Sequence, residues 1–186
     1  MFNKHLKVSM AALCAMAALI PTAAFAADTT VTVNGGALSI SAPSVANFAA
    51  VNLDGTAKET NAAVGTFNVT DARGNGNGWH VTASASQFAE WNGSEYVSGG
   101  KTLAEGSLEL SEPTVAANGT DSPEPTVESG PYTIDNGSGV TLASAAEDEG
   151  MGKYDFGNTS LTLSIPADAY AKTYKSTVTI SVTTAP

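Results

Sequence analysis

The sequence predicts an all-β protein, an antiparallel β-sandwich or flattened barrel that forms a single domain after an N-terminal signal peptide. Three observations support this fold class. Short segments alternate apolar and polar residues, turn-forming Gly and Asn recur between these segments, and no stretch repeats its apolar residues with helical spacing. We therefore expect many short strands that pack around one core.

Residues 1–26 have the parts of a secretory signal peptide. Lys4 and Lys7 form a short basic start, an apolar stretch runs to Ile20, and Ala24-Phe25-Ala26 supplies the small residues that a signal peptidase requires. The apolar stretch is too short for a bilayer, which needs about 20 apolar residues. We predict export, removal of residues 1–26, and a mature domain over residues 27–186 that has no membrane segment.

The mature chain is acidic and contains no cysteine, because Cys14 lies within the signal peptide. Disulfides and thiolate metal sites are therefore excluded. Six Lys and Arg remain against all 18 Asp and Glu, which gives a net charge of −12. Such a surface repels nucleic acid, anionic lipid and anionic wall polymers at long range. Any binding to an anionic surface must then depend on short-range contacts or bridging cations.

Four predicted strands in the first part of the chain alternate with period two. Polar residues separate their inward-facing residues, so each strand has one solvated face. Glu109 stands between two such leucines and is predicted to face solvent. The inward-facing residues, strand by strand, are Leu38 and Ile40; Phe67 and Val69; Trp79, Val81 and Ala83; and Leu108 and Leu110.

Two further strands are predicted near the C-terminus. Residues 160–165 place Leu161, Leu163 and Ile165 on one face, and residues 174–182 alternate in the same way. Burial of each large apolar side chain contributes roughly 1.5–3 kcal/mol, so about a dozen of them help to offset the chain entropy of one domain. The face of residues 174–182 that is predicted to point inward carries Tyr174, Ser176, Val178, Ile180 and Val182.

Two segments are predicted to be loops. Residues 71–78, Asp-Ala-Arg-Gly-Asn-Gly-Asn-Gly, join two strands through glycines that can adopt positive φ. Residues 112–131 contain four prolines and Asn118-Gly119 without any periodicity, so we expect a long exposed excursion there.

Several segments, taken in order, resemble the WxL family of cell-wall-binding surface proteins. Residues 69–74 followed by Gly78-Trp79-His80-Val81 resemble the family's turn and its Gly-Trp-x-Leu sequence. Residues 150–154, 161–166 and 174–186 resemble its second half, so the match runs from about Leu38 to Pro186. The resemblance implies a secreted Gram-positive surface protein that is held to peptidoglycan without a covalent bond.

The sequence departs from the family pattern at two places. Val81 stands where the family prefers Leu, and Ile180-Ser181-Val182 stands where a second Trp-x-Leu is expected. If wall binding needs both tryptophans, this chain binds weakly or binds another ligand. If the tryptophans are core residues, Ile180 fills the same space with less volume.

The aromatic and turn residues have competing interpretations. Trp79 is either a platform for a sugar ring or a core residue, and its alternation with Val81 favours the core. Trp91 and Tyr96 lie among polar and turn residues, where an exposed contact pair for carbohydrate or protein and a small satellite core are equally supported. A structural clamp around the turn is favoured over a ligand site for Asp71, Arg73, Gly74 and Gly78.

No pattern in the sequence predicts catalysis, a metal site or a cofactor. His80, the only mature histidine, is predicted on the solvated face of its strand, and nothing around it suggests a triad. We therefore predict a wall-binding module whose partner is peptidoglycan or another wall glycan. The alternative is a structural or adhesive subunit that assembles with other secreted surface proteins through strand edges or exposed aromatic residues.

Overall fold

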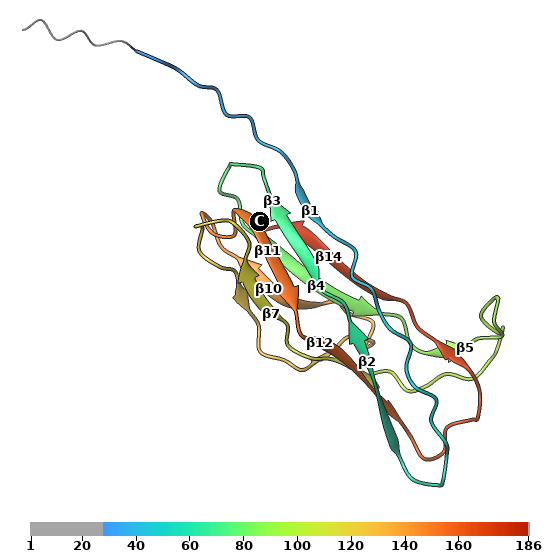
Figure 1. The fold of residues 1–186 in the computed structure, drawn as a ribbon. Coiled ribbons are helices and arrows are strands. Elements are labelled where there is room, and N and C mark those ends of the chain that lie inside the picture. The colour runs from blue at the N-terminus through green and yellow to red at the C-terminus, as the bar shows by residue number, and fades with distance from the viewer. Residues whose placement is uncertain (1–27, 186) are drawn as a thin grey trace, which may run out of the picture. The chain divides into compact units, whose positions relative to one another are not determined.

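The structure is a computed structural model that describes residues 28–185. The predicted signal peptide, residues 1–26, lies outside the described residues. Residues 28–33 are exposed and carry no secondary structure, and a compact unit begins at Asn34. Within residues 28–185 every regular element is a strand, and no helix is long and apolar enough to cross a membrane. The all-β prediction is therefore confirmed (Figure 1).

Within the described residues, fourteen strands form four antiparallel sheets. In chain order they are β1 Leu38–Ile40, β2 Lys58–Val64, β3 Phe67–Asp71, β4 Trp79–Ala85, β5 Ala89–Glu90, β6 Leu108–Leu110, β7 Thr114–Ala117, β8 Thr126–Val127, β9 Tyr132–Thr133, β10 Val140–Ala145, β11 Gly152–Gly157, β12 Thr159–Ile165, β13 Tyr174–Lys175 and β14 Val178–Thr184.

Two of the sheets are parts of one long ladder. Their strand orders are β1-β3-β11-β7 and β2-β12-β6-β9. Phe67 on β3 lies opposite Phe156 on β11, and Val64 on β2 lies opposite Thr159 on β12, so the register continues unchanged from one sheet into the other. The ladder is interrupted only where Asn158 adopts a positive φ of 54°.

The other two sheets form the second layer. The order β14-β4-β10-β8 places the last strand beside β4, with Ile180 opposite Ala83 and Val182 opposite Val81. Beyond them β13 pairs with β5, where Lys175 lies opposite Ala89. Two residues lie between Lys175 and Val178, but three lie between Ala85 and Ala89, so the strand that runs from β4 to β5 carries one extra residue, as in a β-bulge.

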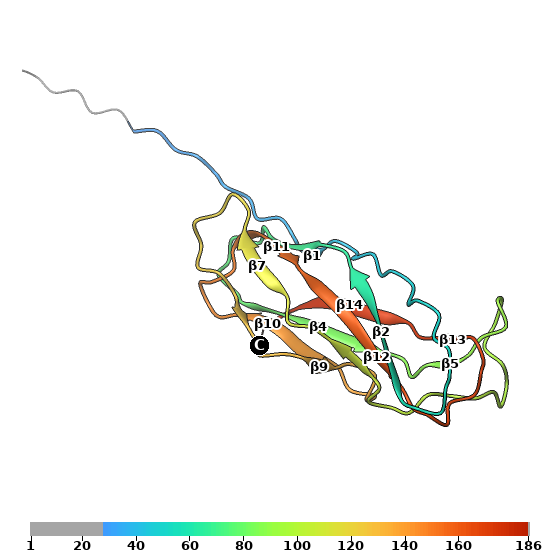
Figure 2. The same ribbon diagram turned by 60° about the horizontal axis from the view of Figure 1, so that its bottom comes forward.

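Aromatic side chains fill the space between the layers. Phe67 and Phe156 stack with their ring centroids 4.9 Å apart, and Trp79 packs against Tyr154 and Phe156 with centroids 6.2 and 6.4 Å away. Trp79 comes from the β14-β4-β10-β8 sheet and its partners come from β11, so these contacts join the two layers. The arrangement is a sandwich, and Figure 2 shows its layers from a second side.

Most of the predicted inward-facing residues are confirmed as buried, whereas Leu38, Ile40 and Ile165 are partly buried against the core. Phe67, Val69, Trp79, Val81 and Ala83 are buried, as are the leucines of β6 and β12. The residues of β14 that were predicted to point inward are only partly buried, because β14 is an edge strand that hydrogen-bonds β4 on one side. Glu109 is exposed, as expected from its position between Leu108 and Leu110.

The predicted loop over residues 112–131 is wrong in part. It contains β7, which pairs with β11, and β8, which pairs with β10. Both strands lie at sheet edges and are mostly exposed, so backbone pairing forms them without an alternating apolar face. Sequence reasoning also missed β2 and β10, whose inward positions are largely occupied by small residues such as Ala62 and Ala143.

Candidate functional site

The tryptophan of the Gly-Trp-x-Val segment is a core residue. Trp79 is 0% exposed, and its indole N–H donates to the carbonyl of Gly150 at 3.0 Å. Burial of the ring and satisfaction of its single polar group leave no face for a sugar. Trp79 thus holds the two layers together, and it is not available as a binding platform.

Two glycines allow Trp79 to take this position. Gly150 has a φ of +68°, and a Cβ there would lie 2.5 Å from the Ala145 methyl and 2.7 Å from the indole nitrogen. A Cβ on Gly78 would lie only 2.1 Å from the carbonyl oxygen of Ala145. Any side chain at either position therefore collides with the packing around the indole. The Gly150 loop and the Gly78-Trp79 step are parts of one packed unit.

Asp71 and Arg73 form a clamp at the same end of the sandwich, which confirms the predicted pairing. The Arg73 guanidinium donates to both carboxylate oxygens of Asp71, at 2.9 and 2.7 Å. It also donates to the carbonyl of Gly78 and to the hydroxyl of Thr184 on the last strand. Gly74 follows in the turn with a positive φ. The clamp ties the turn to the start of β4 and to the end of β14.

The charge state of Asp71 follows from this geometry. Burial of the carboxyl group opposes its ionisation, but the hydrogen bonds and the positive charge of Arg73 outweigh burial and hold the pKa of Asp71 below its usual value. Asp71 is therefore ionised at neutral pH and fully engaged by Arg73. Neither side chain is free to bind an external ligand.

The Ile180-Ser181-Val182 segment lies beside β4 and continues the core. Ile180 and Val182 pack against the buried residues, and Ser181 places its hydroxyl 3.0 Å from that of Thr82. The structure thus uses Ile180 for packing, in the manner expected if the second tryptophan of the family pattern is a core residue.

His80 lies on the outer face of β4. Its Nδ1 is 3.1 Å from the hydroxyl of Ser144, which is the residue directly opposite it on β10. The pair follows from strand register, and among the described residues no carboxylate hydrogen-bonds the imidazole. Nor do residues 28–185 bring three His, Cys, Asp or Glu side chains close enough to hold a metal ion. This face is a shallow polar surface.

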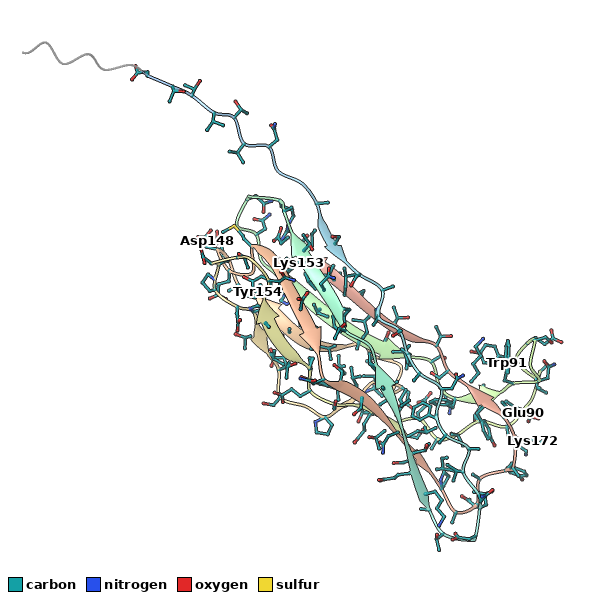
Figure 3. The ribbon with its side chains drawn as sticks, viewed as in Figure 1. Glu90, Trp91, Asp148, Lys153, Tyr154 and Lys172 are labelled. Atoms are coloured by element: carbon teal, nitrogen blue, oxygen red, sulfur yellow. The ribbon has the colours of Figure 1, made fainter. Side chains whose placement is uncertain are left out.

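Trp91 lies at the opposite end of the sandwich (Figure 3), and Tyr96 packs against it. A bridge joins the two residues across a tight turn, in which the side-chain oxygen of Asn92 accepts the backbone N–H groups of Ser94 and Glu95. The rings pack edge to face with centroids 5.1 Å apart. Tyr96 is 45% exposed and Trp91 is half-buried, so the pair combines a hairpin contact with an open aromatic surface.

Sequence reasoning missed the residues that surround this pair. Tyr170 is 57% exposed, and the ammonium group of Lys101 lies 4.2 Å from the centroid of its ring. The ammonium group of Lys175 lies 3.9 Å from the centroid of the Trp91 ring. A run of alternating aromatic and basic residues, Tyr170-Ala-Lys-Thr-Tyr-Lys175, was the available signal. We call Trp91, Tyr96, Tyr170, Lys101 and Lys175 the aromatic end.

An ion pair braces the aromatic end. Lys172 lies 2.9 Å from the carboxylate of Glu90, which also accepts the backbone N–H of Lys101 at 3.0 Å. That backbone N–H and the Lys172 side chain lower the pKa of Glu90, and the Glu90 carboxylate in turn raises the pKa of Lys172. Figure 3 places Glu90, Trp91 and Lys172 at one end, and Asp148, Lys153 and Tyr154 at the other.

Comparisons with known proteins assign the chain to a family. A family model described as WxL domain surface cell wall-binding matches residues 21–186, which is nearly the whole chain. No curated protein and no solved structure matches the chain.

Proposed function

This chain belongs to the WxL family of surface domains that bind the cell wall, and from that premise we propose that it attaches noncovalently to peptidoglycan through its aromatic end. In this proposal the chain is exported by means of residues 1–26 and acts at the cell surface. Its task is attachment, with no chemical step.

The observation that carries the proposal is the contrast in exposure between the two tryptophans. Trp79 is fully buried, whereas Trp91 stands with Tyr96 and Tyr170 in a partly open cluster. Exposed aromatic rings suit the C–H faces of sugars, because the ring replaces poorly hydrated surface while the sugar hydroxyls stay in water. Exposed aromatic clusters on a monomer are typical of contact sites.

The distribution of charge supports the same end. Three of the six mature basic residues, Lys101, Lys172 and Lys175, lie at the aromatic end, where Glu90 pairs with Lys172 and Glu95 lies in the turn before Tyr96. The acidic run 147–149 lies at the other end, beside the Gly150 loop. Because a bacterial wall carries many anionic groups, the acidic end is repelled and the aromatic end approaches with the smaller electrostatic cost.

Co-sedimentation with purified Gram-positive sacculi tests the proposal. We expect the wild-type mature chain to sediment with sacculi, and Trp91→Ala and Tyr96→Ala each to reduce the bound fraction severalfold. His80→Ala is the matched control, because His80 lies on the outer face of the motif strand and is away from the aromatic end. Thermal melts of all variants separate lost binding from lost folding.

Two results would contradict the proposal. Wild-type protein that stays entirely in the supernatant would exclude wall attachment by this chain alone. Sedimentation that depends on protein concentration and not on added sacculi would instead favour assembly with itself or with other secreted surface proteins.

A further inference from the structure

A groove of about 1010 Å³ lies next to the aromatic end. One wall is the segment of residues 45–53, the floor includes Leu161 and Leu163 of β12, and the other wall is the segment of residues 169–176. Trp91 also lines the groove, so it is continuous with the aromatic end. Phe48 anchors the first wall by packing edge to face against buried Phe88, with centroids 5.9 Å apart.

The groove and the hairpin beside it hold the exposed apolar side chains of the compact unit. Within residues 34–185 the exposed large hydrophobic residues are Val45, Leu53, Tyr96, Val97 and Tyr170. Three of them line the groove, and the other two belong to the Trp91 hairpin. A cluster of this kind on an otherwise polar surface indicates a site for an apolar ligand group.

The first wall also offers free backbone groups. Residues 47–53 form no strand, and among the described residues none of their N–H or C=O groups bonds another backbone group. The Thr60 hydroxyl donates to the carbonyl of Ala49, and this is the one side-chain bond to that segment's backbone within residues 28–185. Groups of this type recognise an extended peptide by main-chain hydrogen bonds.

Two lysines at the rim of the groove, Lys101 and Lys175, form no ion pair with a carboxylate of the described residues. Lys175 lines the groove, and Lys101 sits on the ring of Tyr170, which also lines it. The described residues place no carboxylate within 4.0 Å of either ammonium group, although the chain carries 18 acidic residues. Aromatic rings hold these two cations in place, and their charge stays available to an external anion.

We propose that this groove binds the peptide part of peptidoglycan, as a short peptide whose small apolar side chains enter the groove and whose carboxylates meet the positive charges of Lys101 and Lys175. This inference rests on the proposed function. It assigns the two parts of the ligand, glycan and peptide, to two neighbouring surfaces. The glycan strand lies on Trp91 and Tyr96, and a peptide stem enters the groove.

Charge favours this ligand over a phosphate polymer of the wall. A polymer with an anion on every repeat would meet a chain of net charge −12 along its whole contact. Peptide stems carry few carboxylates and are joined to uncharged sugars, so the lysines at the rim can hold them with less long-range repulsion. The small apolar wall, with Ala46, Ala49 and Ala50, fits the methyl groups of short side chains.

Three wall preparations and one soluble peptide test the groove. The preparations are intact sacculi, sacculi stripped of phosphate polymers, and glycan strands freed of peptide stems by an amidase and then coupled to beads. The soluble probe is the free stem peptide, titrated against the mature chain while tryptophan fluorescence is recorded; of the two tryptophans, Trp79 is buried and Trp91 lines the groove. The test variant is Lys101→Gln with Lys175→Gln. Lys153→Gln is the control, because Lys153 also lacks a carboxylate partner within residues 28–185 but lies on β11.

We expect the stem peptide to bind the wild type and the Lys153→Gln control equally, and the double variant about tenfold more weakly. Binding to sacculi should survive loss of phosphate polymers and fall when the stems are removed. Equal binding of wild type and double variant to the peptide would overturn the groove assignment, as would loss of binding on removal of phosphate alone. Failure of the proposed function is distinct from these results, because it abolishes binding to every wall preparation while the peptide titration still reports on the groove.

Discussion

Each end of the sandwich contains one tryptophan, but the two side chains differ in burial and in contacts. At the motif end Trp79 is buried, its N–H is satisfied by Gly150, and an Asp71–Arg73 clamp closes the turn beside it. At the aromatic end Trp91 is half-buried, an edge of Tyr96 and a lysine cover parts of it, and the neighbouring rings are open.

The contrast teaches that the segment with the strongest sequence signature builds the fold. Trp79, the glycines beside it and the Asp71–Arg73 ion pair contact one another and leave no group free for a ligand. The surface suited to a ligand carries no recognisable motif, because exposed aromatic and basic residues tolerate many arrangements. Three changes, from the largest expected effect to the smallest, test this division.

The largest difference is expected between the two tryptophans. Trp79→Ala leaves a large cavity between the layers and removes the partner of the Gly150 carbonyl, so it should lower the free energy of unfolding by about 4 kcal/mol. Trp91→Ala should cost about 1 kcal/mol, because its ring is half-exposed. Urea unfolding followed by far-ultraviolet circular dichroism measures both. Equal losses of unfolding free energy in the two variants would show that Trp79 and Trp91 contribute equally to the fold.

The fold was largely predictable from the sequence, for a physical reason. Alternation reports which side of a strand is buried, so Trp79, Val81, Leu161 and Leu163 were placed correctly. Strands β7 and β8 were not predicted, because short edge strands form by backbone pairing and need no apolar face.

The candidate site was predictable only in part. Trp91 and Tyr96 are close in sequence, so two interpretations of this segment were open, an exposed contact pair and a small satellite core, and the structure combines a contact across one turn with partial exposure. Tyr170 and Lys101 meet only because β13 pairs with β5, and a contact between residues so far apart in the chain cannot be read from local pattern. The groove has the same origin, since its two walls are more than 100 residues apart.

Two glycines at opposite ends provide a second comparison. Gly150→Ala forces a Cβ against Ala145 and the Trp79 indole at a positive φ, so it should cost about 3 kcal/mol of stability. Gly93→Ala also meets a positive φ, of +102°, but a Cβ there finds no atom within 4 Å, and backbone strain alone should cost about 1 kcal/mol. Thermal melts of the two variants measure the difference. If both lose the same stability, close packing at the motif end is not the reason that a glycine stands there.

The smallest effect should depend on pH. Arg73 holds the pKa of the Asp71 carboxyl below its unfolded value, so the ion pair stabilises the fold above about pH 4 and its contribution disappears as the pH falls through the lower, folded pKa. Asp71→Asn removes the charge and keeps the shape, and should cost about 2 kcal/mol at pH 7. Because wild-type Asp71 is itself neutralised in acid, the stability difference between the two proteins should shrink steadily below about pH 4. Urea titrations from pH 7 to pH 2.5 measure this difference, and a gap that stays constant with pH would place the cost of Asp71→Asn in packing. Wall binding of Asp71→Asn at pH 7 should match the wild type, because the clamp lies at the end of the sandwich that faces away from the aromatic end.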